Sequence, residues 1–314
     1  MSDDRRPSDP AQAWFARASS TWRDWPAADL LAAKGDHRIS VVIPARNEAA
    51  TIGEIVAAVR ADLVDGVGLV DELVVIDSDS TDATAEIAAR SGAIVYAARQ
   101  IGPQLENHPG KGEALWKSLF VTTGDLLVFI DGDLTGWGTH FVTGLLGPLL
   151  ADPRVELVKG FYDRVLDDGT GRHAAQGGRV TELVARPLLN LYWPELARVV
   201  QPLAGEWAIR RATFERLPVP VGYGVEMGSL LDVYEQSGLD ALAQVDLGSR
   251  AHSHQAIHDL GVMAAEILAL AARRVGSRDR ASSQLWQFQR ENQPPWNARA
   301  VPVAERPPFR DRAH

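Results

Sequence analysis

The stretch DLLVFIDGD, residues 125–133, is an apolar run that ends in two acidic side chains. The run Leu126–Ile130 is typical of a strand buried on both faces of a parallel sheet. Asp131 and Asp133 follow it, and residues two apart in an extended segment point the same way, while Gly132 leaves room for a ligand. Because two converging carboxylates repel, we expect a divalent cation, Mg²⁺ or Mn²⁺, to bridge them to substrate phosphates. The alternative is a polar turn with two solvated aspartates.

Two earlier segments repeat this pattern of a strand that ends in polar residues. Strands are expected over residues 38–45 and 71–80, with helices over 48–63 and from about Thr81, the second of them capped by Ser80 or Thr81. A strand over 92–98 and a helix over 111–123 continue the alternation. Such alternation indicates a parallel sheet, whose ligands lie beyond the carboxyl ends of the strands. Taken alone, each of these strand ends is equally consistent with an ordinary turn into a helix.

The second half of the chain has a less regular pattern. We expect strands over residues 155–162, 205–211 and 241–248, and helices over 180–193, within 219–238 and over 259–274. Residues 167–179 are polar and rich in glycine, which predicts a loop. From about Ser277 onward the sequence predicts a tail that is partly disordered or packed through Trp286 and Trp296.

Composition excludes several classes of function. The 314 residues carry a net charge of −9, which argues against a nucleic acid or an anionic membrane as the main partner. Without cysteine there is no disulfide, no thiolate nucleophile and no cysteine-bound metal. The polar N-terminal segment and the lack of an apolar run of about 18 residues predict a cytoplasmic protein with no membrane anchor.

The strand ends VVIPARNE, VVIDSDSTDAT and VFIDGD together resemble the nucleotide-diphospho-sugar glycosyltransferases of the GT-A fold, an α/β fold with a mainly parallel sheet flanked by helices. The motifs PGKGEALWKSL, GGRVTELVARPLL, QPLAGEWA, GYGVEMG and QVDLGSRAH extend the resemblance over Ile39–His254 to the family of glucosyl- and mannosyl-3-phosphoglycerate synthases. It implies an N-terminal extension (1–37), a nucleotide-sugar-binding half (38–135), an acceptor-binding half (136–276) and a C-terminal tail (277–314).

The resemblance also implies a reaction. Glucose would move with retention from a nucleotide-diphosphate glucose, UDP-glucose being favoured, to the 2-hydroxyl of 3-phospho-D-glycerate, a precursor of glycosylglycerate solutes. GDP-mannose is the alternative donor. Relatives lead us to expect a homodimer, which the apolar helix over 263–272 could support, although that helix could equally be core.

Site residues follow from the resemblance, position by position. The nucleotide-sugar site would comprise Pro44, Ala45, Arg46, Glu48, Ser78, Lys111, Asp131, Gly132, Tyr223, Glu226 and Arg250. Asp133 and His252 would ligate the metal, and Gly178, Arg179, Val180, Thr181 and His254 would bind the acceptor. Position 46 is Arg where the family has Leu, and position 254 is His where it has Asn.

The resemblance leaves the mechanism of retention open. Asp133, Leu203 and Glu226 would be catalytic, with the Leu203 carbonyl orienting the acceptor hydroxyl. Glu226 is the only carboxylate that the resemblance places near the sugar, so it is either a nucleophile or a ligand of sugar hydroxyls. We expect the second role, with the acceptor attacking from the leaving-group face.

Three other interpretations compete with this one. A polyprenyl-phosphate glycosyltransferase shares the three strand ends, but it needs a lipid acceptor and the chain has no apolar anchor. A catalytically inactive nucleotide-sugar-binding module is disfavoured because Asp133, His252, Arg179 and Lys111 are all present. A Rossmann dehydrogenase is disfavoured because no G-x-G-x-x-G follows the first strand.

Overall fold

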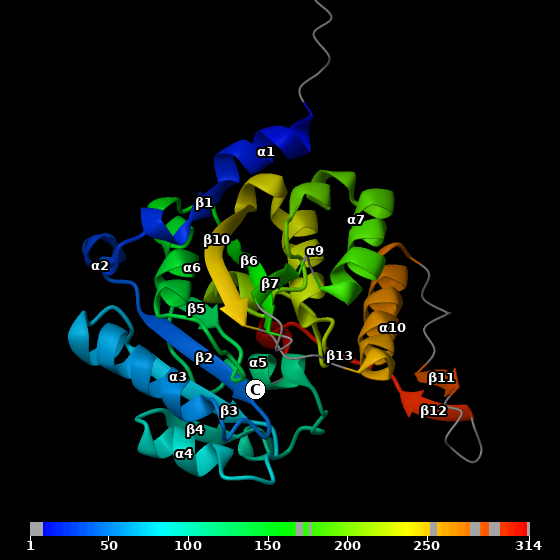
Figure 1. Cartoon of the computed structure of the whole chain (residues 1–314), viewed down its shortest axis with the longest axis horizontal. Coiled ribbons are helices and arrows are strands. Elements are labelled where there is room, and N and C mark those ends of the chain that lie inside the picture. Colours follow the sequence, from blue (N-terminus) through cyan, green and yellow to red (C-terminus); the bar gives the residue numbers. More distant parts are fainter. Residues whose placement is uncertain are drawn as a thin grey trace, which may run out of the picture.

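A mixed nine-stranded sheet forms the centre of the protein (Figure 1). The computed structural model describes residues 9–167, 172–175, 178–251, 256–276, 283–288 and 296–312. The strand order is β1-β10-β6-β8-β5-β2-β3-β4, with β7 beside β6. The strands of this sheet are β1 Ser19–Thr21, β2 Ile39–Ala45, β3 Glu72–Asp77, β4 Ile94–Ala97, β5 Leu126–Phe129, β6 Leu157–Asp167, β7 Arg172–Ala175, β8 Trp207–Arg210 and β10 Leu242–Ala251.

Most neighbouring strands run parallel. The pairs β4–β3, β3–β2, β2–β5, β6–β10 and β10–β1 are parallel, whereas β8 is antiparallel to both β5 and β6. The predicted α/β fold with a mainly parallel sheet is therefore confirmed. Small antiparallel pairs lie outside this sheet: β11 Gln284–Phe288 with β12 Trp296–Ala300, and β9 Val219–Pro220 with β13 Glu305–Arg306.

Helices cover both faces of the sheet because alternate side chains of each buried strand point to opposite faces. In β5, Leu127 and Phe129 join one core, whereas Leu126 and Val128 join the other. Helices α5, α9 and α10 contribute to the first core, and α3, α4 and α6 to the second. The helices are α1 Pro10–Ala18, α2 Ala27–Lys34, α3 Ile52–Val59, α4 Thr84–Arg90, α5 Lys111–Ser118, α6 His140–Ala151, α7 Arg186–Tyr192, α8 Arg211–Phe214, α9 Val225–Ser237 and α10 Ile257–Arg274.

Two helix starts differ from the prediction. Helix α3 begins at Ile52 rather than Glu48, and the amide of Ile52 donates to the Glu48 carbonyl (3.0 Å). Helix α4 begins at Thr84, and the Asp82 side chain, not Ser80 or Thr81, accepts from its first amide (3.0 Å). Ser80 instead accepts from the amide of Asn47 (2.9 Å). This residue, which was predicted to cap the helix, thus joins the loop after β3 to the loop after β2.

The region predicted as a loop over residues 167–179 is partly a strand. Strand β7 (172–175) pairs antiparallel with the distal end of β6. Its residues, RHAA, form no apolar face, and main-chain pairing with β6 defines the strand. The sequence therefore has no periodicity here from which this strand could be recognised.

The segments at both ends contribute to the fold. Strand β1 pairs with β10 at the edge of the main sheet. Hairpin β11–β12 projects beyond α10 (Figure 1), and Trp286 and Trp296 are exposed on it, so the expected packing through these tryptophans is wrong. The four-part division of the chain stays a prediction.

Residues 301–312 pack against α5 by a buried ion pair. The Arg306 guanidinium donates to both carboxylate oxygens of Glu113 (2.7 and 2.6 Å), which is 1% exposed. Lys117 Nζ lies 3.3 Å from the same carboxylate. Strand β13 pairs with β9, and the amide of Val221 donates to the carbonyl of Ala304 (3.1 Å). This segment therefore fixes both the start of α5 and the turn that precedes α9.

We predict that Arg306→Ala destabilises the protein by about 3 kcal/mol, because Glu113 would stay buried with only Lys117 and the amide of His108 as partners. Arg310→Ala, which removes an exposed arginine four residues away, is the matched control and should change little. Urea unfolding of both variants measures the difference. Equal stabilities would show that the buried pair contributes nothing to the fold.

Candidate functional site

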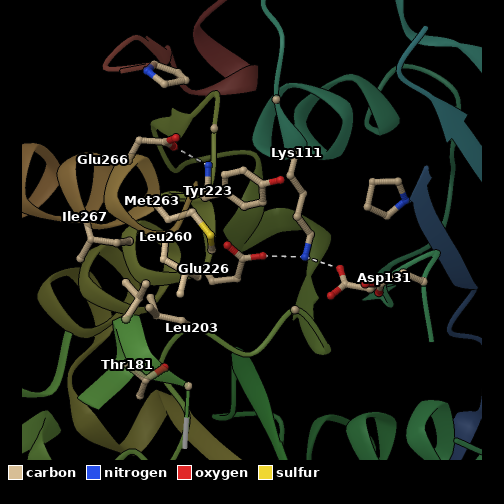
Figure 2. A pocket seen from close by; sticks show the side chains of 18 of the residues that line it. Lys111, Asp131, Thr181, Leu203, Tyr223, Glu226, Leu260, Met263, Glu266 and Ile267 are labelled. Atoms are coloured by element: carbon tan, nitrogen blue, oxygen red, sulfur yellow. Dashed lines mark hydrogen bonds and ion pairs between the residues drawn. The ribbon is translucent and has the colours of Figure 1, made fainter. Parts of the chain in front are cut away.

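A cavity of about 490 Å³ lies at the carboxyl ends of β2 and β5. Its other walls come from the start of α5, the residues before α9 and one side of α10 (Figure 2). Most of the predicted site residues meet there: Pro44, Arg46, Glu48, Lys111, Asp131, Asp133, Gly178, Arg179, Val180, Thr181, Leu203, Tyr223, Glu226 and Arg250. Residues from both halves of the chain thus form one site, as the parallel-sheet rule for ligands leads us to expect.

Three predicted residues do not line the cavity. Ala45 and Gly132 are buried, and a Cβ on Gly132 would come within 3.3 Å of the Pro44 carbonyl, so glycine permits the close contact between β2 and the β5 loop. Ser78 follows β3, and its amide donates to the Ala45 carbonyl (2.9 Å). His252 and His254 lie outside the described residues.

Lys111 occupies the centre of the cavity between two carboxylates (Figure 2). Its ammonium donates to Asp131 Oδ1 and lies 2.7 Å from Glu226 Oε1. Burial alone would lower the pKa of Lys111, but the two carboxylates outweigh it and raise the pKa above its ordinary value. Lys111 is the first residue of α5, so the helix start sets its position. It remains a fixed positive charge across the physiological range.

Arg250 holds a second group of acidic side chains together. Its guanidinium donates to Glu206 Oε1 (2.7 Å), Asp133 Oδ1 (2.7 Å) and the Tyr162 hydroxyl (3.2 Å), and Nη1 lies 3.6 Å from Asp131 Oδ2. The next residue, Ala251, donates its amide to the Thr135 carbonyl (3.0 Å). The end of β10 is thereby joined to the loop that follows β5.

Glu48 faces both aspartates across the mouth of the cavity. Burial, followed by the charges of Asp133 and Asp131, raises its pKa from 4.5 to about 7. Three carboxyl groups thus crowd one region, and Asp133 remains half exposed, which leaves room for further ligands. Hard divalent cations prefer such oxygen donors and would relieve this repulsion. Asp133 can therefore supply one ligand for Mg²⁺ or Mn²⁺, but no three His, Asp or Glu side chains of the described residues are placed to hold the ion together.

The predicted acceptor residues lie at the opposite side of the cavity from β2. Gly178–Val180 lead into a helical turn, Thr181–Ala185, and the amide of Glu182 donates to the Gly178 carbonyl (2.9 Å). Thr181 is 3% exposed, whereas the Arg179 side chain is exposed. This pair offers an exposed cationic fork beside a buried hydroxyl group.

Several lining residues were missed by the sequence analysis: Tyr162, Gly205, Leu260, Met263, Glu266, Ile267 and Pro302. Leu260, Met263 and Ile267 form one stripe of α10, at the spacing of a buried helix face. Glu266 interrupts this apolar helix with a charge, and it is 4% exposed. The signal in the sequence that could have identified Glu266 was an acidic residue within the apolar run 263–272.

Glu266 fixes the turn that carries Tyr223. Its Oε2 accepts from the amide of Tyr223 (2.6 Å), as Figure 2 shows. A Cβ on Gly222 would lie 2.2 Å from the same oxygen, so glycine is required for this approach. Burial, with a further contribution from Glu226, raises the pKa of Glu266 from 4.5 to about 7.

Comparison with known proteins gives consistent matches. The model of "Glycosyl transferase family 2" matches residues 40–202. The chain is 44% identical to glucosyl-3-phosphoglycerate synthase of Mycolicibacterium paratuberculosis, over 98% of this chain and 94% of the relative. It is also 44% identical to that of Mycolicibacterium smegmatis, over 94% and 97% of the two chains.

Solved structures match over the same length. Glucosyl-3-phosphoglycerate synthase from Mycobacterium tuberculosis, in complex with Mn²⁺, UDP-glucose and phosphoglyceric acid, superposes with a TM-score of 0.83 at 44% identity. The match covers 94% of this chain and 98% of that one. None of the helices in the described part of the chain is both long and apolar enough to cross a membrane.

We predict that Glu266→Gln removes a pH-dependent loss of stability. A carboxyl whose pKa is raised by folding contributes stability below its unfolded pKa of 4.5, and this contribution is lost as pH rises through about 7. Between pH 5 and pH 8 the wild-type protein should therefore lose roughly 2 kcal/mol relative to Glu266→Gln. Urea unfolding across this range measures it, with exposed Glu86→Gln as control. Parallel curves for wild type and Glu266→Gln would contradict the assignment.

Proposed function

The chain belongs to glycosyl transferase family 2 and, within it, to the group of the glucosyl-3-phosphoglycerate synthases, and from this we propose that it transfers glucose from UDP-glucose to the 2-hydroxyl of 3-phospho-D-glycerate. The observation that carries the proposal is the meeting, in one cavity, of the carboxylates that follow β5, two buried cations and the Gly178–Thr181 segment. A nucleotide-sugar needs the carboxylates and the two cations. An anionic acceptor needs the Gly178–Thr181 segment.

On the donor side, Asp133 would hold a divalent cation, together with His252 as the resemblance implies. When bound, such a cation would supply positive charge to the departing diphosphate. Lys111 and Arg250 contribute further positive charge from opposite sides, and Glu206 keeps Arg250 in place. Stabilising charge on the leaving group is then the main contribution of these residues to catalysis.

On the sugar side, Glu226 would accept hydrogen bonds from sugar hydroxyls. Its ion pair with Lys111 fixes the carboxylate in the middle of the cavity. The Leu203 main chain lies nearby (Figure 2), and its carbonyl would orient the acceptor hydroxyl for attack on the same face from which the diphosphate leaves. Arg46, Pro44 and Glu48 would border the nucleotide, with Ala45, Ser78 and Gly132 supporting them from behind.

On the acceptor side, Arg179 and Thr181 would bind the phosphate or carboxylate of 3-phosphoglycerate. A guanidinium fork suits either anion, and Gly178 allows close approach of the main chain. In a protein of net charge −9, this anion needs a local cationic site. His254 would add a further contact.

The direct test is incubation of the purified protein with 3-phosphoglycerate, Mn²⁺ or Mg²⁺ and one nucleotide-sugar at a time, with mass spectrometry of the product. We expect a hexosyl-phosphoglycerate from UDP-glucose. Product from GDP-mannose alone would make the mannosyl alternative correct. No product from any donor, with nucleotide-sugar still bound, would favour an inactive binding module.

We also propose that the protein is a homodimer. Large apolar side chains are exposed on α7, α10 and hairpin β11–β12, among them Leu191, Leu268 and Trp286. Light scattering of the purified protein would decide between one chain and two, and Leu268→Glu should shift a dimer toward monomer. A cytoplasmic location and a role in making glycosylglycerate solutes remain predictions.

We predict that Asp133→Asn keeps the fold but lowers turnover by at least about 100-fold, because an amide is a poorer ligand for a hard cation than a carboxylate. Mn²⁺ affinity, measured by calorimetry, should fall in the same variant. Asp65→Asn, at an exposed carboxylate paired with Arg60, is the control. Full turnover of Asp133→Asn, or of chelator-treated wild type, would rule out a metal at Asp133.

We predict that Arg179→Ala lowers kcat/KM for 3-phosphoglycerate roughly 10- to 100-fold, the loss of a hydrogen bond to a charged group being worth about 1.5–3 kcal/mol. Arg179→Lys should lose less, because it keeps the charge but not the fork. The KM for UDP-glucose should stay unchanged, and exposed Arg198→Ala serves as control. Weaker donor binding with intact acceptor saturation would place the acceptor elsewhere.

A further inference from the structure

Lys159 is a buried lysine whose role the proposed chemistry leaves unexplained. It lies on β6, is 2% exposed and does not line the cavity. Its ammonium donates to the Ala204 carbonyl (2.7 Å) and lies 5.7 Å from the centre of the Trp207 ring. Burial lowers the pKa of Lys159 to about 8. Because burying an ammonium costs several kcal/mol, we expect Lys159 to have a role that offsets this cost.

The carbonyl that Lys159 holds belongs to the segment Gln201–Glu206. Strand β6 fixes this segment at two further points: the Gln201 side chain donates to the Tyr162 carbonyl (2.6 Å), and the amide of Gly160 donates to the Glu206 carbonyl (2.9 Å). Within the segment, the amide of Ala204 donates to the Gln201 carbonyl (3.1 Å). The segment is therefore attached to β6 at Gln201, Ala204 and Glu206, on both sides of Leu203.

The segment has little freedom to move toward the cavity. A Cβ on Gly205 would lie 2.2 Å from Asp131 Oδ2, so its main chain rests against the Asp131 carboxylate. Leu203 and Gly205 both line the cavity. The position of the Leu203 main chain relative to Asp131 and Lys111 is thus set from below by β6.

An apolar side chain could fill the space that Lys159 occupies, but it could not replace two of its contributions. Only a donor can bond to the Ala204 carbonyl, and only a cation adds positive charge near Glu226, Glu206 and Asp131, which favour the charged form of Lys159, whereas Lys111 disfavours it. The ammonium therefore holds the main chain of the segment by a hydrogen bond that an apolar side chain could not make.

From these contacts we propose that Lys159 is a positioning residue, which holds the Leu203–Gly205 main chain where its carbonyl can orient the acceptor hydroxyl. Lys159 acts through this segment and does not touch substrate. The inference rests on the proposed glycosyl transfer, and it adds a specific role for a residue outside the cavity.

The test is Lys159→Met, which keeps the length of the side chain and removes its charge and donor. We expect kcat to fall roughly 10- to 100-fold, since a misplacement of about 1 Å can cost this much, with the KM for UDP-glucose unchanged. Deuterium uptake in peptides that span residues 201–206 should become faster. Lys34→Met is the matched control: Lys34 is 8% exposed and pairs with Asp71 (2.8 Å), which precedes β3 and so lies at the amino ends of the strands, away from the cavity.

A second variant, Gln201→Leu, removes the other side-chain anchor of the segment and should show the same division between kcat and KM. If Lys159→Met fails to fold, Gln201→Leu is measured in its place. A loss of stability with wild-type kcat and wild-type exchange at residues 201–206, as expected for Lys34→Met, would overturn the proposal. If the wild-type protein forms no product, the proposed function fails, but the exchange measurement still decides whether Lys159 holds the segment.

Discussion

The structure depends on one electrostatic constraint: carboxylates that end buried strands must be neutralised. Asp131 and Asp133 follow β5, and Glu206 and Glu226 approach them from later in the chain. Two cations compensate them, Lys111 from the start of α5 and Arg250 from the end of β10. Both cations must lie at the carboxyl ends of the strands. The strand order makes this possible, because it places β2 and β8 beside β5, and β10 beside β6.

This internal neutralisation also prepares the cavity for anions. Lys111 and Arg250 are already ordered by acidic partners, so a diphosphate that enters finds cations in place and does not have to order flexible side chains. It must, however, compete with Asp131, Asp133 and Glu226 for them. Glu206 is fully buried and remains bound to Arg250 in either case. Glu206 therefore stays a permanent partner of Arg250, whereas a bound diphosphate can take the place of Asp131, Asp133 and Glu226 beside the two cations.

Periodicity and strand-end residues predicted the sheet, and they predicted the cavity through Pro44, Glu48, Asp131 and Asp133. The resemblance added Lys111, Arg250 and Arg179 from later motifs. Single buried charges could not be found in this way, because their partners are distant: Glu206 lies 44 residues from Arg250, and Glu113 lies 193 residues from Arg306. Lys159 and Glu266 look like interruptions of apolar runs until the fold shows what they contact. Strand β7 was missed because its residues have no apolar alternation.

The contact between Arg306 and Glu113 also orders events during synthesis. Pro302 is the last residue of the described cavity lining to be made, and Arg306 follows it, whereas Glu113 is made 193 residues earlier. On a growing chain, Glu113 has Lys117 and the amide of His108 as its available partners, and Pro302 is still missing from the cavity lining. Every strand of the main sheet is made before residue 301, so the sheet has all its strands before this segment exists. The cavity is therefore closed on this side by a late step, and an incompletely translated chain cannot present a finished binding site to its substrates.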